Sequence, residues 1–128
     1  MEKETAQFRL ADYRISKSLI EIHPEKGDAA ANLKVRFGHP NQIDIKDGTL
    51  VYPMGVKIED ENSVINIDVT MLGMFEFDKD IQETQSFTEV NAPAILFPYL
   101  RAYITTLSSL SGIHPIILPT LNMTKAKG

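Results

Sequence analysis

The side chains most able to carry out chemistry in this sequence are its three histidines. His23, His39 and His114 each stand directly before a proline, and a residue in that position favours an extended or turn conformation. No two of them have the i, i+4 spacing that places a pair of imidazoles on one face of a helix to bind zinc. We therefore interpret all three as turn residues without a catalytic or metal-binding role.

The hydroxyl, thiol and carboxyl groups give no stronger pattern. The serines at 108–111 fall within an apolar segment, whereas a nucleophilic serine needs a strand-to-helix turn, so we interpret them as small residues that let a second helix approach. The chain has no cysteine, which excludes thiolate metal sites. The glycines match neither a phosphate-binding loop nor a dinucleotide fingerprint. We expect no catalytic residue, no metal and no cofactor, and therefore no enzyme.

Acidic residues are concentrated in one stretch of the chain. Between Glu59 and Glu89 there are nine acids against Lys79 alone, although the net charge of the whole chain is only −4. Such a stretch repels nucleic-acid phosphates and favours basic partners, or it forms a solvated face that keeps the protein soluble. Binding of nucleic acid is not expected.

Composition and hydropathy indicate a cytoplasmic protein. The chain is 43% hydrophobic and 23% charged, its N-terminal residues lack the apolar core of a signal peptide, and no apolar run is long enough to span a membrane. The absence of cysteine is consistent with a reducing compartment. We expect one domain over residues 1–128, with flexible ends at 1–6 and 124–128.

Alternating apolar residues predict a sheet of antiparallel strands. Between Phe8 and Ile22 the apolar positions change parity twice, which predicts a long strand with one or two bulges or a bend. The clearest strand is 65–77, whose odd positions are nearly all large and apolar and whose even positions are mainly polar.

Two further strands lie between these. The alternation over 33–45 is interrupted at Gly38–Asn41, and Asp47-Gly48 is a tight-turn signal that leads into a strand over 50–58. Pro53 cannot donate to a strand ladder, so this strand is expected to be irregular or to lie at an edge.

The segment 91–112 is the one strong helix signal. Its apolar residues recur at spacings of three and four along one stripe, and that stripe is Leu96, Leu100, Tyr103, Leu107 and Leu110. Other apolar residues cover much of the remaining circumference, and Arg101 is the only charge. A helix that is apolar on more than one side needs two covering layers. We therefore expect a second copy of the chain to pack on it, with the stripe at the oligomer interface.

The helix ends also have recognisable signals. Pro98 predicts a kink or a restart of the helix, and Gly112 is placed to be a left-handed cap. The predicted fold class is α+β, a four-stranded antiparallel sheet followed by one long helix.

Residues that add apolar surface outside this core are candidates for binding other proteins. Leu72 and Met74 lie on the otherwise polar side of the strand over 65–77, and the short strand over 33–37 contributes three more. The resulting candidate client-binding residues are Leu33, Val35, Phe37, Leu72 and Met74.

The run Ile95-Leu-Phe-Pro-Tyr, followed by Arg101 and then Ile104-Thr105, resembles the first long helix of the SecB family of protein-export chaperones. Asn91-Ala-Pro before it and the Pro115–Asn122 segment after it are also similar to family segments, as is Gly73-Met-Phe. The resemblance covers the chain from about Phe8 to Met123.

The resemblance implies a homotetramer, a dimer of dimers with the long helices between sheets. It also implies an ATP-independent holdase that binds unfolded or non-native polypeptides in apolar grooves, for protein export or to guard an antitoxin. Leu33, Val35 and Phe37 fall where the family has an alternating apolar segment that contributes to client binding.

Partner docking is implied in the same way. Asp68 and Glu21 align with acids through which family members dock the translocase motor, although Lys17 stands where another acid is expected and Asn66 replaces an apolar residue. The family usually continues into a second helix that walls the groove, whereas this sequence ends shortly after Met123. A more open groove is therefore expected, or a groove that another element covers. The alternative function is a dedicated adaptor on the same fold with one specific partner.

Overall fold

The computed structural model describes residues 8–38, 40, 43–78 and 87–120. Its elements, in order, are β1 (Phe8–Ile22), the 3-10 turn η1 (Pro24–Lys26), β2 (Leu33–Gly38), β3 (Asp44–Lys46), β4 (Thr49–Asp60), β5 (Ile65–Phe77), the π-helical turn η2 (Phe87–Asn91) and α2 (Ala92–Leu110). All strand pairs are antiparallel, and the sheet has the order β1-β5-β4-β2, with β3 also paired to β4. The predicted α+β class is confirmed.

The sheet has five strands because the interrupted segment over 33–45 forms two. β2 and β3 both pair with β4, and the residues between them leave the ladder. Asp47 and Gly48, with φ of 50° and 80°, form the tight turn from β3 to β4, which is the left-handed geometry that an Asp-Gly pair favours. The two phase changes in β1 are register shifts against β5, between Leu10 and Asp12 and between Ile15 and Lys17.

Pro53 lies in the interior of the sheet, since β4 pairs with β5 along its whole length. The expectation of an edge strand is therefore wrong for β4 as a whole. Among the described residues, Pro53 itself nevertheless lies where β4 has no neighbouring strand on one side. β3 pairs with residues 49–51 of β4 and β2 pairs with residues 55–60, so Pro53 falls in the gap between them. A residue without an N–H weakens no ladder where no neighbouring strand needs its hydrogen.

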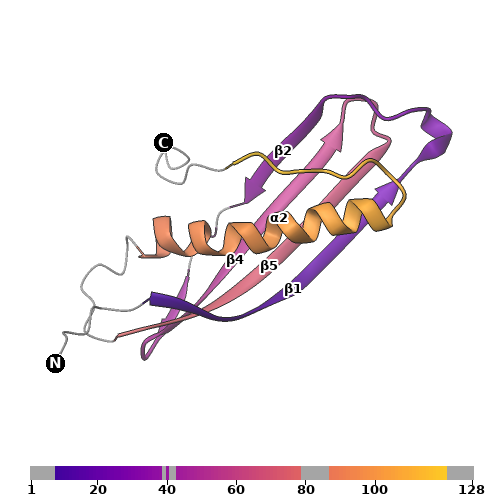
Figure 1. The fold of residues 1–128 in the computed structure, drawn as a ribbon. Helices are drawn as coiled ribbons and strands as arrows, with labels where there is room; N and C mark the ends of the chain where they lie inside the picture. The colour runs from indigo at the N-terminus through magenta and orange to yellow at the C-terminus, as the bar shows by residue number, and fades with distance from the viewer. Residues whose placement is uncertain (1–7, 39, 41–42, 79–86, 121–128) are drawn as a thin grey trace.

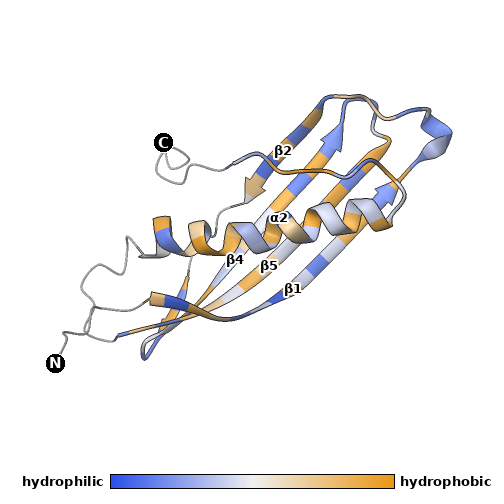
Figure 2. Cartoon of the chain, in the orientation of Figure 1, coloured by the Kyte–Doolittle hydropathy of each residue, from blue (hydrophilic) through white to orange (hydrophobic). Residues whose placement is uncertain are grey.

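The helix α2 crosses one face of the sheet (Figure 1). Its Leu96, Leu100 and Ile104 have no exposed surface and pack against buried residues of β4 and β5. Close approach depends on Gly73, where a Cβ atom would lie 2.9 Å from the Phe75 ring and 3.0 Å from Leu96. The core therefore lies between the helix and the alternate residues of the two central strands (Figure 2).

The helix continues through Pro98 as one element and ends at a left-handed Gly112 with φ of 89°. This confirms the predicted cap, in which the Gly112 N–H donates to the Ser109 carbonyl and the Ile113 N–H donates to the Ser108 carbonyl. The chain then turns back and runs alongside α2 over the same face of the sheet (Figure 1). Residues 113–118 of this return are called the C-terminal segment below.

Candidate functional site

The five residues predicted to bind clients lie on opposite faces of the sheet. Leu33, Val35 and Phe37 belong to the helix-covered face, where they are half-buried against the core. Leu72 and Met74 belong to the other face, because their neighbours in β5 that alternate with them are buried under the helix. A single bound segment cannot contact both sets, so the structure brings together only the β2 residues.

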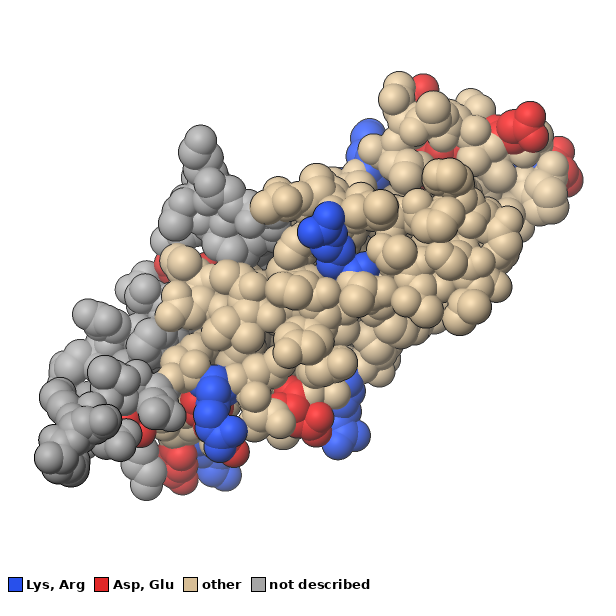
Figure 3. Space-filling model, in the orientation of Figure 1, with Lys and Arg blue, Asp and Glu red and all other residues tan. Residues whose placement is uncertain are grey.

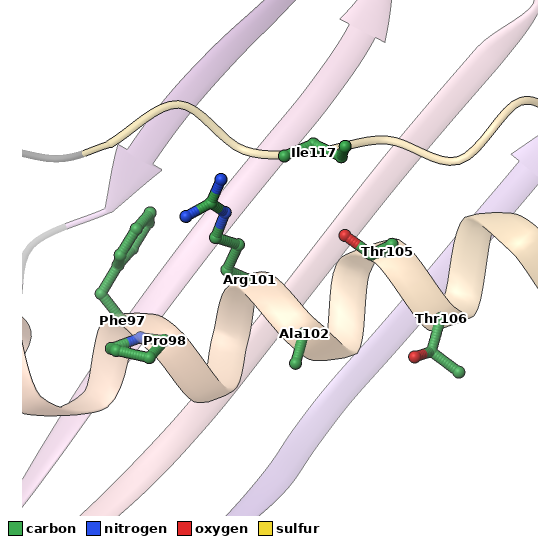
Figure 4. A pocket seen from close by; sticks show the side chains of 7 residues that line it. All are labelled: Phe97, Pro98, Arg101, Ala102, Thr105, Thr106 and Ile117. Atoms are coloured by element: carbon green, nitrogen blue, oxygen red, sulfur yellow. The ribbon is translucent and has the colours of Figure 1, made fainter.

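An apolar groove lies beside these β2 residues on the helix-covered face. One pocket of about 550 Å³ is bounded by Ala29–Ala31 and Leu33 on one side and by Ile113–Ile117 on the other. A second, of about 560 Å³, lies between the C-terminal segment and α2 (Figure 4). Its lining residues are Phe97, Pro98, Arg101, Ala102, Thr105, Thr106 and Ile117. We call the two pockets together the groove; Ile117, whose side chain is 65% exposed, belongs to both.

The floor of the groove is continuous with the core. The rings of Phe37 on β2 and Phe97 on α2 meet edge to face with centroids 5.9 Å apart, a favourable aromatic geometry. This contact links β2 to the helix beneath the C-terminal segment.

Two helix side chains hold the C-terminal segment in place. The Thr105 hydroxyl donates to the Ile116 carbonyl at 2.7 Å, and the Ile116 N–H donates to the Ser108 hydroxyl at 2.9 Å. Ile116 and Leu118 point into the core and are buried. The expectation that the serines ease the approach of a second helix is wrong for Ser108, because this residue is fully buried within its own chain.

The opposite wall of the groove is held by Asp60. Its buried carboxylate accepts backbone N–H bonds from Ala30 at 2.9 Å, from Val64 and Ile65 at 2.8 Å each, and from Asn62 at 3.2 Å. The Ile65 N–H contributes most to a pKa of Asp60 below its usual value, and burial opposes this shift. One carboxylate thus joins the β4–β5 turn to the segment that leads into β2.

The open face of the sheet carries the predicted docking acids. Asp68 pairs with Lys17 at 2.8 Å, and the Glu21 carboxylate accepts a bond from the Asn66 amide at 3.1 Å. Both lie on neighbouring strands, as β1 residues 19 and 21 stand opposite β5 residues 68 and 66. They are close together, but their charges are already engaged within the chain.

Other acids of the stretch from Glu59 to Glu89 also have partners within the chain. Arg36 pairs with Glu59 at 3.7 Å, and Arg9 pairs with Glu76. Since Asp60 is buried and hydrogen-bonded, four of the acids between Glu59 and Glu76 have partners inside the molecule. The negative charge of these four acids is therefore partly offset within the molecule.

The helix stripe predicted at the oligomer interface is divided by the fold. Leu96 and Leu100 have no exposed surface because they pack on the chain's own sheet, and Tyr103 and Leu107 are half-buried. Tyr103 donates a 2.7 Å hydrogen bond to the Ser18 hydroxyl of β1. Leu110 is 83% exposed.

Exposed apolar surface remains at the β1 side of the helix. The Tyr99 ring packs against Tyr13 of β1 at 4.9 Å, and each of these tyrosines is 43% exposed. Charged side chains are sparse across the middle of the helix-covered face and gather towards its margins (Figure 3). Tyr13, Tyr99 and Leu110 are here called the outer flank.

Within the described residues, no three His, Asp or Glu side chains gather in a way that could hold a metal ion. His23 lies 3.8 Å from Glu21 and 3.4 Å from Glu25, and His114 is exposed at the groove. His39 lies outside the described residues. In the same part of the chain, no helix has the length and hydrophobicity needed to span a membrane.

Comparison with known sequences decides the family. The sequence model of the family described as preprotein translocase subunit SecB matches residues 26–126, which is most of the chain. The chain belongs to the SecB family. Among SecB-named relatives, the protein-export protein SecB of Neisseria gonorrhoeae is 27% identical over 104 residues, covering 80% of this chain and 71% of the relative.

Other relatives extend the comparison. An uncharacterized protein of Methanocaldococcus jannaschii is 39% identical over 70 residues, but the match covers only 45% of that protein. The SecB fold is shown by the Mycobacterium tuberculosis SecB-like chaperone Rv1957, solved in complex with a ChAD peptide from the HigA1 antitoxin. It superposes with a TM-score of 0.71 and 16% identity, over 90% of this chain and 88% of that one.

Three features of this SecB-family site escaped the sequence analysis. Asp60 reads as one of several turn acids, and its role depends on N–H groups up to 30 residues away. The C-terminal segment is apolar in the sequence, but nothing local places it beside α2. Arg101 stands out as the lone charge of the helix, which was the available signal for its position in the groove.

Proposed function

We propose that this SecB-family protein is an ATP-independent chaperone, a holdase that binds unfolded or non-native polypeptides in the groove. The observation that carries this proposal is the pair of apolar pockets on the helix-covered face, continuous with Leu33 on one side and with Phe97 on the other. Binding uses shape and hydrophobicity and needs no catalytic group, so we propose no enzymatic activity.

Affinity in this proposal comes from burying apolar side chains of the client. Each Å² of apolar surface removed from water contributes roughly 25 cal/mol, and ordering the client opposes part of this gain. Val35 and Phe37 are half-buried, so each retains surface that a bound side chain can cover. Recognition of this kind is tolerant of sequence, as a holdase requires.

The direct test is suppression of aggregation without nucleotide. The purified protein is mixed with a chemically denatured test protein on dilution, and light scattering is followed over time. We expect scattering to be delayed at stoichiometric ratios and to be unchanged by ATP. Scattering that rises as fast as it does without the chain would contradict the proposal.

We further propose a homotetramer, a dimer of dimers, in which the outer flank contacts a second copy. Leu110 is the suitable probe, because its side chain is 83% exposed and supports no packing within the chain. Leu110→Asp places a charge in the contact, where burial without a partner is unfavourable. We expect a reduced native mass by sedimentation for this variant and no change for Leu110→Met. A parent that sediments as a monomer would refute the assembly.

The pathway is proposed to be cytoplasmic, serving either protein export or the protection of an antitoxin. The Neisseria relative is named for protein export and the Mycobacterium structure holds an antitoxin peptide. Docking of the translocase motor would use Asp68 and Glu21, which requires the Lys17 pair to open. If export is the pathway, Lys17→Ala should strengthen motor binding measured by calorimetry, while Lys34→Ala should not.

The second candidate function is a dedicated adaptor with one partner. It is favoured by the complex of the Mycobacterium chaperone with one peptide from one antitoxin. Competition among unrelated unfolded peptides separates the two candidates. A holdase releases a labelled peptide when any of several apolar peptides is added, whereas an adaptor releases it for only one.

A further inference from the structure

Arg101 is an isolated positive charge in an otherwise neutral part of the groove. Its side chain extends from α2 towards the C-terminal segment that carries Ile117 (Figure 4). The other residues that line this pocket are apolar or carry only hydroxyl groups, and the Thr105 hydroxyl already donates to the Ile116 carbonyl. The guanidinium is thus the main polar group available to a bound molecule.

No counter-charge is built into the walls. From Ala92 to the end of the sequence there is no aspartate or glutamate, so neither α2 nor the C-terminal segment can neutralise Arg101. Within the part of the chain that the structure describes, its guanidinium has no ion pair. On the sheet, by contrast, Arg9 and Arg36 are paired with Glu76 and Glu59.

This isolation has a consequence for any apolar segment that enters the pocket. A ligand that covers the guanidinium removes water from it, and a desolvated charge without a partner is unfavourable. A carboxylate at that place offsets the loss with charge-assisted, bidentate hydrogen bonds, which the planar guanidinium favours. A basic residue at the same place adds repulsion.

We propose that Arg101 is a specificity-determining residue of the groove, which selects extended apolar segments that carry an aspartate or glutamate side chain. This inference rests on the proposed chaperone function and adds the class of client. It reverses the expectation of basic clients drawn from the acidic stretch, because none of those acids within the described residues lines the groove and Glu59, Asp68 and Glu76 are paired with basic residues of the sheet.

The test uses the native full-length protein and short fluorescent apolar peptides whose C-termini are amidated. One peptide has a central aspartate and its twin has asparagine. We expect the aspartate peptide to bind about tenfold more tightly, and added salt to reduce the difference. Arg101→Gln should abolish the preference, so that the two peptides bind this variant with equal affinity.

The matched control is Arg14→Gln, which removes the same charge from the exposed part of β1. It should retain the preference. Equal binding of the twins to the parent protein would overturn the inference and leave the chaperone function standing, whereas no binding of any peptide would overturn both.

Two further measurements test whether Arg101 binds a different carboxylate, namely the C-terminus of a peptide or an acid of a second copy of the chain. Tighter binding of the asparagine peptide with a free C-terminus, without a preference for the aspartate side chain, would assign Arg101 to chain ends and overturn the proposal. A reduced native mass for Arg101→Gln, with unchanged peptide preference, would assign it to an acid of a second copy and overturn it as well.

Discussion

The two faces of the sheet are built from the same five strands but are stabilised in different ways. On the helix-covered face, alternate residues of β4 and β5 are large, apolar and almost fully buried. On the open face, the intervening residues form charge pairs across strands, such as Lys17 with Asp68 and Arg36 with Glu59. A few apolar residues, including Leu72 and the 40% exposed Met74, interrupt them.

The difference indicates where a polypeptide can bind. The open face carries charges, several of which are already paired, while the helix-covered face is apolar and is incompletely filled beside β2. The proposed binding surface lies at the margin of the covering layer, where the C-terminal segment runs between α2 and the residues that lead into β2. Five predictions test this contrast.

The largest effect is expected in the covered core. Leu100→Ala removes a fully buried side chain and should lower the free energy of unfolding by about 3 kcal/mol. Leu110→Ala, the same change at an 83% exposed position of the same helix, should stay within about 0.5 kcal/mol. Urea denaturation measures both. Equal losses would mean that the two sides of α2 do not differ as described.

The next largest effect is expected at Asp60, which holds the wall of the groove. Asp60→Asn directs an amide N–H at backbone donors, so at least one pair of the four hydrogen bonds is lost. We expect a lower melting temperature, whereas the exposed neighbour Glu61→Gln should leave it unchanged. A normal melting temperature in Asp60→Asn would contradict the role given to this carboxylate.

Asp60 also predicts a pH dependence. Its pKa is lowered in the folded state from the usual 3.8, chiefly by the Ile65 N–H. A lowered folded pKa stabilises the protein above the unfolded value, and this contribution is lost as the pH falls from that value through the folded pKa. The melting temperature of the parent should fall in this acid range more steeply than that of Asp60→Asn, as calorimetry across the range would measure.

A smaller effect, on peptide affinity, distinguishes the predicted client-binding residues of β2 from those on the open face of β5. Phe37→Ala removes the ring that packs against Phe97 of the groove and should weaken the binding of an apolar peptide about tenfold, equivalent to about 1.4 kcal/mol. Met74→Ala on the open face should leave the affinity unchanged. Fluorescence anisotropy with one labelled peptide measures both variants, and a loss in Met74→Ala alone would move the binding site to the open face.

The smallest effect is expected for the charge pairs of the open face. Lys17→Met removes the partner of Asp68, and an ion pair this exposed contributes about 0.2–1 kcal/mol. The difference from the parent should shrink at high salt, because ions screen exposed charges. Denaturation at low and high salt gives the comparison. A loss as large as that of Leu100→Ala would show that the open face is not held by weak pairs.

The sequence predicted the fold class, an irregularity in the pairing of β1, the tight turn at Asp47-Gly48 and the Gly112 cap. It placed the apolar residues of β2 at a candidate site, but it grouped them with Leu72 and Met74, which the fold puts on the other face. It assigned Leu96 and Leu100 to a partner copy, whereas the chain's own sheet covers them. An apolar stripe on a helix indicates that its side chains are covered, but it does not indicate which element covers them.

What the sequence determined by itself is therefore the local geometry. The period of two in a strand, the stripe along a helix and the left-handed preference of Gly are properties of neighbouring residues and the backbone between them. Only the tertiary structure decided which acids are neutralised, that Asp60 binds the Ala30 N–H, and that the C-terminal segment runs beside Arg101. These contacts join residues far apart in the chain, and which partners meet depends on how the whole core packs.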